Sequence, residues 1–382
     1  MNDALINFTA DLVRLPSVLG NEGPCAERVV REMKKLGYEH SEIDHAGNAV
    51  GVIEGGHAGP TVVLDGHLDT VDVMPREAWS HDPFGAEIVE GRMYGRGTSD
   101  MKGAVAAMVY GAARVDRKAC KGRIVVSASV GEELIEGPAL RCVLERYPAD
   151  FVIIGEATNL DLVVAGRGRA EFVITTHGTP SHASRPDLGD NAVHKMMVII
   201  AEFETLRMPE YPGVGKGVMA LTDIISKPYP AHSVIPSGCR ATYERRLMPG
   251  ETLEELLAVL RRACARANAP DTTIELATCH YTTYTGLEWH EPKWLPAWVF
   301  DESEPIVARA RVGLLAEGLF PRLDSYQFCT NAAYSAGTAG IPTIGFGPSN
   351  ETLAHVVDEY IELEQLTRAA EGYQAIVEAL LA

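Results

Sequence analysis

Histidine and acidic side chains recur at the ends of apolar segments in this sequence. The first is His67, which follows the apolar run 61–64 and stands two residues before Asp69. Alternate residues of an extended strand point to one side, so His67 and Asp69 share a face. A metal-binding histidine usually donates its second ring N–H to a carboxylate, and Asp69 is placed to accept it. A His-x-Asp pair by itself is equally typical of a strand-end histidine beside a solvated aspartate, so residues elsewhere must decide.

Further residues of the same kind follow glycine-rich turns and apolar strands later in the chain: Asp100, Glu132, Glu133, Glu156 and His355. Two imidazoles and three carboxylates suit two cations such as Zn²⁺ that share one carboxylate and keep positions open for water and substrate. A hydroxide bridging two such cations is a nucleophile at neutral pH. Of the adjacent Glu132 and Glu133, one can ligate a metal while the other transfers the proton. For Asp100 the competing interpretation is the N-cap of the helix that follows it.

Strands that alternate with helices must position these side chains. We predict helices at 23–36 and 102–115 and strands at 48–54, 61–68, 123–130, 151–154 and 342–346. This alternation favours an open, mostly parallel α/β sheet, whose sites lie at the carboxyl ends of the strands. The candidate residues at 67, 132, 133 and 156 all come just after such ends.

The middle of the chain has a different order of elements. We predict strands at 171–176, 218–226, 239–247 and 272–281, with helices at 191–206 and 252–267. The order βαββαβ is that of a ferredoxin-like module. We therefore expect residues 170–287 to form a domain inserted into a discontinuous catalytic domain, which comprises residues 1–169 and 288–382.

Composition limits the partners and the compartment. The 382 residues carry a formal charge of −18 without a Lys/Arg-rich run, which argues against nucleic acid and anionic membranes as partners. Seven scattered cysteines without a Cys-x-x-Cys pair indicate reduced thiols rather than disulfides or a thiolate zinc site. The N-terminal segment has no basic region followed by an apolar core, so we expect no signal peptide or membrane span and a cytoplasmic protein.

Six ordered segments carry a resemblance to a known family. They are Gly66-His-Leu-Asp-Thr70, Gly95-Arg-Gly-Thr-Ser-Asp-Met-Lys-Gly-Ala104, Gly131-Glu-Glu133, Gly155-Glu-Ala-Thr158, Gly178-Thr-Pro-Ser-His-Ala-Ser-Arg-Pro186 and Phe346-Gly-Pro-Ser-Asn-Glu-Thr-Leu-Ala-His355. Together they resemble the co-catalytic zinc hydrolases that include acetylornithine deacetylase, succinyl-diaminopimelate desuccinylase, aminoacylase-1 and carboxypeptidase G. The resemblance covers essentially the whole chain and implies that the inserted module is a lid and dimerisation domain.

The resemblance also implies a role for each candidate residue. It implies two Zn²⁺ ions per subunit, with Co²⁺ or Mn²⁺ as alternatives, held by His67 and Glu156 on one side, Glu133 and His355 on the other, and Asp100 between them. Glu132 would be the general acid/base, and Asp69 would orient His67. The family pattern further implies a cis peptide bond between Asp100 and Met101.

Substrate contacts follow less directly. The resemblance implies that His182 reaches the active site of the other subunit and stabilises an oxyanion, although it could be an ordinary loop histidine. Arg246 matches an arginine that often holds a substrate carboxylate; the adjacent Arg245 could do the same, or Arg246 could form a surface ion pair. Ser233 and Asn331 stand where relatives commonly carry Asn and Asp near the substrate, so the specificity of the named enzymes cannot be transferred.

The aromatic stretch 280–298, together with residues 328–331, looks most like a less characterised subgroup of peptidases linked to selenium or purine-associated operons. Its rings could line a pocket for a large acyl or aromatic group, or they could pack a hinge between the domains.

These observations predict a homodimeric zinc amidohydrolase that cleaves an N-acyl amino acid or small peptide through a metal-bridging hydroxide. One alternative is an aminopeptidase of single-domain type, against which the inserted module argues. Another is a non-catalytic binding protein, which would be expected to lack a ligand or the base. A third, hydrolysis of a non-peptide C–N bond by deamination or decarbamoylation, stays open.

Overall fold

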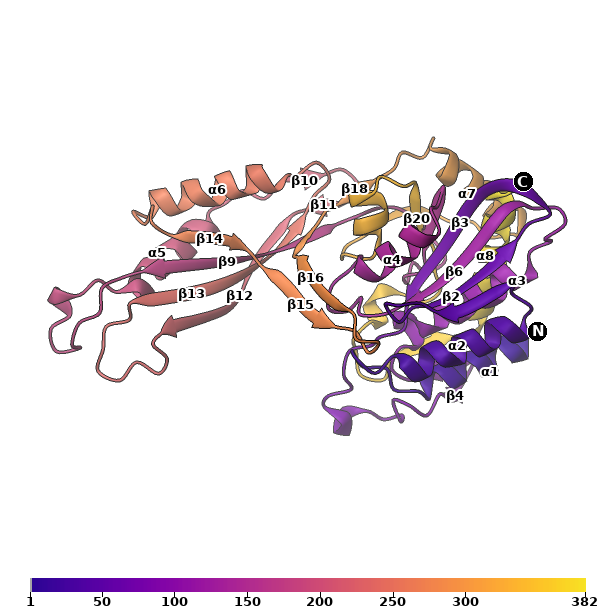
Figure 1. Ribbon diagram of the computed structural model, residues 1–382, viewed down its shortest axis with the longest axis horizontal. Coiled ribbons are helices and arrows are strands. Elements are labelled where there is room, and N and C mark those ends of the chain that lie inside the picture. The colour runs from indigo at the N-terminus through magenta and orange to yellow at the C-terminus, as the bar shows by residue number, and fades with distance from the viewer. Residues whose placement is uncertain (1) are drawn as a thin grey trace.

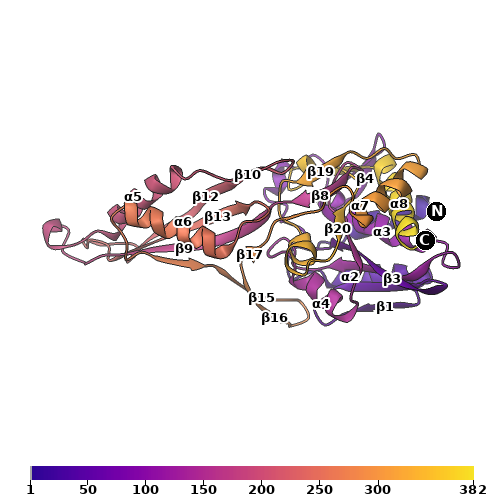
Figure 2. The same cartoon turned by 90° about the horizontal axis from the view of Figure 1, so that it is seen from above.

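The molecule is elongated and consists of a large body joined to a narrower inserted module (Figures 1 and 2). The computed structural model describes residues 2–382. Both chain termini lie in the large body, at its far end from the inserted module (Figure 1). The chain therefore leaves the body, builds the module and returns, as the sequence predicts for an insertion.

A nine-stranded sheet forms the centre of the large body. Its order is β1 (His40–Ile43), β2 (Ala49–Glu54), β6 (Lys121–Ser129), β3 (His57–His67), β7 (Phe151–Ile154), β20 (Thr343–Gly345), β8 (Leu162–Gly166) and β18 (Trp298–Val299), with β19 (Leu323–Tyr326) also paired to β8. The four central strands β6, β3, β7 and β20 run parallel, and antiparallel pairs lie toward both edges. The mixed, mostly parallel α/β sheet is thus confirmed.

Helices cover both faces of this sheet, and its central strands accordingly bury apolar side chains on both faces. One face packs against α1 (Asn2–Val13), α2 (Gly23–Lys35), α3 (Gly103–Arg114), α7 (Pro305–Ala316) and α8 (Leu363–Leu380). The other face packs against α4 (Pro138–Arg146). Alternate residues of β3 separate accordingly: Val62 and Leu64 join the first core, and Val63 joins the second.

The inserted module has a five-stranded sheet of its own. Its order is β12 (Val218–Lys227), β13 (Gly238–Leu247), β9 (Gly168–His177) and β14 (Thr273–Leu276), with β17 (Trp294–Leu295) also paired to β9, and all pairs are antiparallel. The helices α5 (Ala192–Glu204) and α6 (Leu253–Arg266) lie together on one face and enclose a separate core (Figure 2). This arrangement matches the predicted βαββαβ order.

The last predicted strand of the module, 272–281, is wrong as one strand. It is divided into β14 and β15 (Thr278–Thr282), and β15 pairs with β16 (Glu288–Pro292) in a separate hairpin that reaches the large body (Figure 1). The reason is competition for one strand edge, because β17 pairs with β9 at Arg169 and Ala170, directly beyond the stretch that β14 occupies. We call β15 and β16 with their turn the hinge hairpin.

Two small sheets complete the structure. They are β10 (Glu210–Tyr211) with β11 (Gly215–Lys216), and β4 (Glu87–Val89) with β5 (Arg92–Tyr94) and β21 (Tyr360–Glu362). Among residues 2–382, no helix combines the length and the apolar character needed to cross a bilayer.

Candidate metal centre

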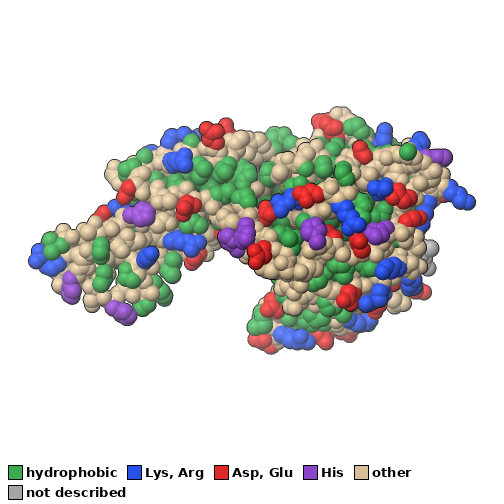
Figure 3. Space-filling view, in the orientation of Figure 1, with side chains coloured by type: hydrophobic (Ala, Val, Ile, Leu, Met, Phe, Trp, Pro, Cys, Tyr) green, Lys and Arg blue, Asp and Glu red, His purple; other side chains and the backbone are tan. Residues whose placement is uncertain are grey.

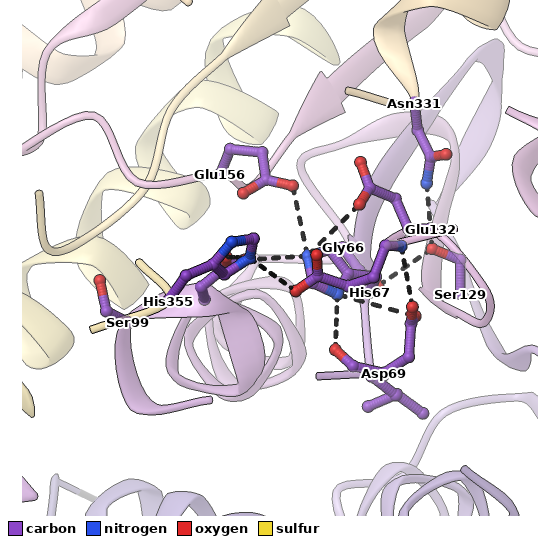
Figure 4. A network of polar contacts seen from close by, with 12 residues as sticks. Gly66, His67, Asp69, Ser99, Ser129, Glu132, Glu156, Asn331 and His355 are labelled. Atoms are coloured by element: carbon purple, nitrogen blue, oxygen red, sulfur yellow. Dashed lines mark hydrogen bonds and ion pairs between the residues drawn. The ribbon is translucent and has the colours of Figure 1, made fainter. Parts of the chain in front are cut away.

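The predicted metal ligands come together at one edge of the central sheet. His67 is the last residue of β3, Glu132 and Glu133 follow β6, and Glu156 follows β7. Because these strands are parallel neighbours, their carboxyl ends meet (Figure 4). Asp100 arrives in the turn before α3 and His355 in the loop after β20. No segment of the chain supplies more than two of these groups, so the tertiary fold assembles the site.

Asp100 lies between the two histidines. Its Oδ1 is 3.0 Å from His67 Nε2, and its Oδ2 is 3.1 Å from His355 Nε2. Glu156 Oε1 lies 3.5 Å from His67 Nε2, and Glu133 Oε1 lies 3.0 Å from His355 Nε2. Each imidazole therefore has one carboxylate of its own and one oxygen of the shared Asp100. That is the donor arrangement required of two cations bridged by one carboxylate.

Glu132 also faces His67, with Oε2 at 3.8 Å from Nε2. Donor atoms of His67, Asp100 and Glu133 lie within 4.8 Å of one another, as do those of His67, Glu132 and Glu156. Nitrogen and carboxylate donors at these separations suit a borderline dication. Proximity alone does not separate a ligand from a base at Glu132, since both must stand beside the same cation.

The charges of the site favour bound cations. Burial raises the pKa of Glu156 to about 8 and the pKa of Glu132 well above its ordinary value. Burial disfavours the charged form of His67, yet the neighbouring carboxylates, Glu132 foremost, raise its pKa well above 6.5. Hydrogen bonds to two carboxylates, Asp100 first, raise the pKa of His355 to about 10. Burial thus opposes ionisation of Glu132 and Glu156, and bound dications would favour their charged forms.

Asp69 is buried beside His67, but the expected contact differs in detail. The His67 Nδ1–H donates to the backbone carbonyl of Asp69 at 2.9 Å, whereas the carboxylate Oδ1 lies 3.7 Å away. Asp69 Oδ2 instead accepts the backbone N–H of Glu133 at 2.9 Å. Asp69 therefore orients His67 through its main chain and the Glu132–Glu133 turn through its side chain.

The N-cap interpretation of Asp100 is wrong. Helix α3 begins after Lys102, which has no side-chain cap, and the Asp100 carboxylate faces the two imidazoles instead. Hydrogen bonds from both imidazoles outweigh the effect of burial and lower the pKa of Asp100. The cis peptide bond between Asp100 and Met101 is confirmed.

A cavity of about 160 Å³ is lined by the predicted metal ligands. Its further lining residues are Glu136, Arg169, Arg246, Phe328 and Cys329. Arg169 on β9 and Arg246 on β13 stand directly opposite each other, so both guanidinium groups come from the face of the module sheet that its helices leave free. Figure 3 shows the surface hollowed between the module and the large body.

The structure distinguishes Arg246 from Arg245. Arg246 lines the cavity and pairs with Glu244 at 2.8 Å. Arg245 is buried on the opposite face of β13 and pairs with Glu251 at 2.6 Å. Arg246 is therefore the one of the two that a substrate can reach. Sequence reasoning missed Arg169, whose Nη2 lies 2.5 Å from Glu136 Oε2; no local motif distinguishes it from a surface arginine.

His182 and Ser233 lie away from the cavity within one chain. They belong to neighbouring segments, joined by the bridge between His182 and Val234 and by an Ala183 N–H to Ser233 carbonyl bond of 2.9 Å. The loop that carries His182 connects β9 to α5 at the outer end of the module (Figure 1). Both side chains are exposed. Neither residue is among those that line the cavity of the same chain.

Asn331 has a position that differs from the predicted substrate contact. It is buried beneath the strand ends, where its Nδ2 donates to Asp65 Oδ2 at 2.8 Å and to Ser129 Oγ at 3.1 Å (Figure 4). Its Oδ1 accepts the Gly137 N–H at 2.6 Å. With both ends of the amide used internally, Asn331 supports the strand that carries His67.

The aromatic stretch 280–298 packs the hinge. The Trp289 ring covers Gly131, where an added Cβ would lie 2.8 Å from Cζ3, and Trp298 covers Gly166 in the same way. Tyr284 Oη donates to the Gly47 carbonyl at 2.8 Å. Phe328 lines the cavity, whereas no residue of 280–298 does. The structure therefore favours the alternative in which the aromatic residues of 280–298 pack between the two domains.

Comparison with known proteins identifies the family of this chain. The sequence profile described as peptidase family M20/M25/M40 matches residues 63–379. The chain belongs to this family. The M20 profile spans all the candidate metal ligands and the inserted module, so the predicted family of metallopeptidase-type hydrolases is confirmed.

Relatives and solved structures of the M20 type cover the chain end to end. Protein YgeY of Escherichia coli K12, described as uncharacterised, is 32% identical over 97% of this chain and 93% of its own length. Succinyl-diaminopimelate desuccinylase of Stenotrophomonas maltophilia R551-3 is 29% identical over 99% of both chains. The aminopeptidase PepT of Bacillus cereus shares the fold with a TM-score of 0.76 at 21% identity, covering 100% of this chain and 99% of its own.

A further M20 structure bears on the metal. The Bacillus subtilis YxeP protein, described as a dinuclear metal-binding peptidase, aligns with a TM-score of 0.74 at 16% identity over 100% of this chain and 98% of its own. At this identity the match shows a shared fold. Membership of the family makes the M20 chain a hydrolase of the metallopeptidase type with a two-part fold, and its own residues must indicate the metal count and the substrate.

Proposed function

We propose that this protein is a dinuclear zinc amidohydrolase that hydrolyses the amide bond of an N-acyl amino acid or small peptide. The observation that carries the proposal is the Asp100 carboxylate, whose two oxygens each face one imidazole at 3.0 and 3.1 Å. His67 and Glu156 would hold one ion, and Glu133 and His355 the other. When bound, two dications polarise a carbonyl and lower the pKa of a water molecule to near neutrality.

Glu132 is the proposed general acid/base. It is buried at the cavity wall, and no hydrogen bond of its carboxylate competes for it among the described residues. Burial raises the pKa of Glu132 above the ordinary carboxyl value, and a carboxylate at this place can accept a proton from water and return it to the leaving amine. Asp69 holds the adjacent backbone through the Glu133 N–H, so the orientation of Glu132 is set by a buried contact.

The cavity wall suits a substrate with a carboxylate. Arg246 presents a planar guanidinium that can bind two carboxylate oxygens at once, and it is already oriented by Glu244. A carboxylate bound there would place a neighbouring amide over the metal ligands that line the same cavity. This geometry favours an N-acyl amino acid or a peptide over a neutral amide as the substrate. The relative named succinyl-diaminopimelate desuccinylase supports the same substrate class.

We further propose a homodimer in which His182 completes the site of the other subunit. The outer edge of β12 has no partner strand among residues 2–382, and its side chains Val218, Ile224 and Ile225 are exposed. Figure 3 shows hydrophobic side chains along this margin of the module. An unpaired apolar edge favours pairing with a second copy, which would bring its His182 loop into play.

The proposed function is tested by screening N-acyl amino acids and dipeptides with Zn²⁺-, Co²⁺- or Mn²⁺-reconstituted protein, while free amine and ammonia are measured separately. We expect amine release from a carboxylate-bearing amide, abolished by chelation and by Glu132→Gln. Release of ammonia without amine would favour deamination instead, and release of ammonia together with amine from an N-carbamoyl amino acid included in the screen would favour decarbamoylation. Turnover that survives complete metal removal would refute the proposal.

A further inference from the structure

Glu359 is a fully buried carboxylate that belongs to none of the proposed catalytic groups. Its Oε1 accepts the backbone N–H of Ser99 at 2.7 Å and that of Asp100 at 3.0 Å. Its Oε2 accepts from Arg96 Nη1 at 2.6 Å. Both oxygens are therefore occupied, and two of the three donors belong to the backbone that presents the shared metal ligand.

The chain places Glu359 at a junction between two ligand-bearing segments. It follows His355 by four residues and immediately precedes β21, which pairs antiparallel with β5. Beyond β5 the chain enters the turn that ends at Asp100, and the Gly95 N–H donates to the Glu359 carbonyl at 2.8 Å. The main chain and side chain of Glu359 thus connect the segment of His355 to the turn of Asp100.

We propose that Glu359 is a positioning residue that fixes Asp100 relative to His355 and so sets the affinity of the metal position shared by these two residues with Glu133. The inference rests on the proposed dinuclear function. His355 is the more exposed of the two histidines, with 52% of its side chain accessible against 2% for His67, and its Nε2 contacts Asp100 and Glu133. Its distance from Asp100 therefore depends on how firmly the two segments are joined.

The requirement is for a carboxylate. Each Glu359 oxygen faces donors only, either two backbone N–H groups or a guanidinium. An amide in its place would turn its NH₂ group toward one of these donors in either orientation, because glutamine carries one acceptor and one double donor. Such a buried mismatch displaces the turn instead of merely weakening one bond.

Arg96 supplies the opposing charge. It is almost fully buried, lies over the Trp79 ring at 5.1 Å, and is within 3.5 Å of the Asp72 carbonyl through Nη2. Arg96→Gln would leave both backbone contacts of Glu359 in place. The pair of variants therefore separates loss of the backbone contacts from loss of the countercharge.

The experiment compares Glu359→Gln with Glu362→Gln. Metal-free full-length protein is titrated with Co²⁺, and binding is measured by calorimetry and by visible absorption. Glu362 is a matched control because it also joins β21 to β5, through an exposed ion pair with Arg92 at 3.4 Å. For Glu359→Gln we expect the first Co²⁺ to bind as in the wild type and the second to bind about 10- to 100-fold more weakly. The control should bind both ions as the wild type does.

Saturating Co²⁺ should restore most of the kcat of Glu359→Gln, because the substitution lowers the affinity for the second ion and removes no reacting group. Arg96→Gln should weaken the second ion less, and it provides the test if Glu359→Gln does not fold. Two ions bound with wild-type affinity in the Glu359→Gln variant, or in Arg96→Gln if only that variant folds, would overturn the inference. A wild-type protein that binds a single ion would instead overturn the dinuclear function itself, so the two failures are distinguishable.

Discussion

The catalytic body and the inserted module present their functional side chains in opposite ways. In the body, His67, Glu132 and Glu156 are buried at strand ends, and even the orientation of their backbone is set by residues such as Asp69. In the module, His182 and Ser233 are exposed at the outer end, on two loops that contact each other. The candidate metal ligands are thus held by buried contacts, whereas the proposed substrate and subunit contacts of the module lie on its surface.

The difference shows where precision is required. A cation pair tolerates little displacement of its ligands, and parallel strands with two buried faces hold their ends firmly. Contacts to a varying substrate, or to a second subunit, must form and release, and exposed loops permit this. Arg169 and Arg246 lie between these extremes, on strands of the module but within the cavity of the body.

The largest effect on kcat is expected from a substitution at the buried site of the large body. Glu132→Gln is expected to lower kcat by about 10³- to 10⁴-fold, because an amide cannot take the proton, while metal content stays that of the wild type. Steady-state kinetics and elemental analysis of the same preparation test this. An unaltered kcat would remove Glu132 as the base, and loss of one metal ion would make it a ligand instead.

The second prediction tests the exposed His182 loop of the inserted module. His182→Ala should lower kcat by about 10²- to 10³-fold without changing thermal stability, because its side chain is exposed. Mixing this variant with Glu132→Gln under subunit exchange should restore about a quarter of wild-type activity, since each mixed dimer regains one complete site. If His182 served its own chain, no mixed dimer would contain a complete site and the mixture would stay inactive.

The third prediction concerns the boundary between the two regions. Arg246→Met should raise KM by about 10- to 100-fold for a carboxylate-bearing substrate, through loss of a charge-assisted contact, and should affect kcat less. Arg245→Met is the control, because that side chain faces the module core and should alter stability rather than KM. Equal kinetic effects from both variants would contradict the assignment of Arg246.

The smallest effect concerns a buried glutamate of the body. Burial raises the pKa of Glu22 to about 7, so the folded protein binds its proton more tightly than the unfolded chain does. The stability that this provides is present below the unfolded pKa of 4.5 and is lost as pH rises through 7. Between pH 5 and pH 8, Glu22→Gln should therefore gain about 2 kcal/mol in unfolding free energy relative to the wild type.

Urea unfolding of metal-free protein at the two pH values tests the Glu22 prediction. Glu32 is the matched control in α2, the helix that Glu22 immediately precedes. Its side chain is also buried, but hydrogen bonds from Tyr110, Lys35 and Arg28 lower its pKa despite burial. The Glu32 carboxyl group is mostly ionised from pH 5 to 8 in both the folded and the unfolded protein. The loss of unfolding free energy caused by Glu32→Gln should therefore hardly change over this range. A pH-independent difference for Glu22→Gln would contradict a raised pKa at that position.

Much of the site could be predicted because its residues follow elements with strong local signals. The four-residue apolar run before Glu156 indicated a strand covered on both faces, and β7 occupies those residues. Parallel strands must end at a common edge, so polar residues after several such strands had to meet. Arg169 and Glu359 carried no such signal. Their roles depend on a cross-strand neighbour and on a turn more than 250 residues away in sequence, respectively.

The sequence by itself determined the ligand types, their order and the strands that carry them, because hydrophobic periodicity and glycine turns are local properties. Tertiary structure decided which oxygen faces which imidazole, that Asn331 supports a strand, and that Arg246 rather than Arg245 reaches the cavity. It also decided where the strand predicted at 272–281 divides, since β17 competes for the same edge of β9. These outcomes depend on which distant segments share a face or an edge, and a local pattern does not contain that information.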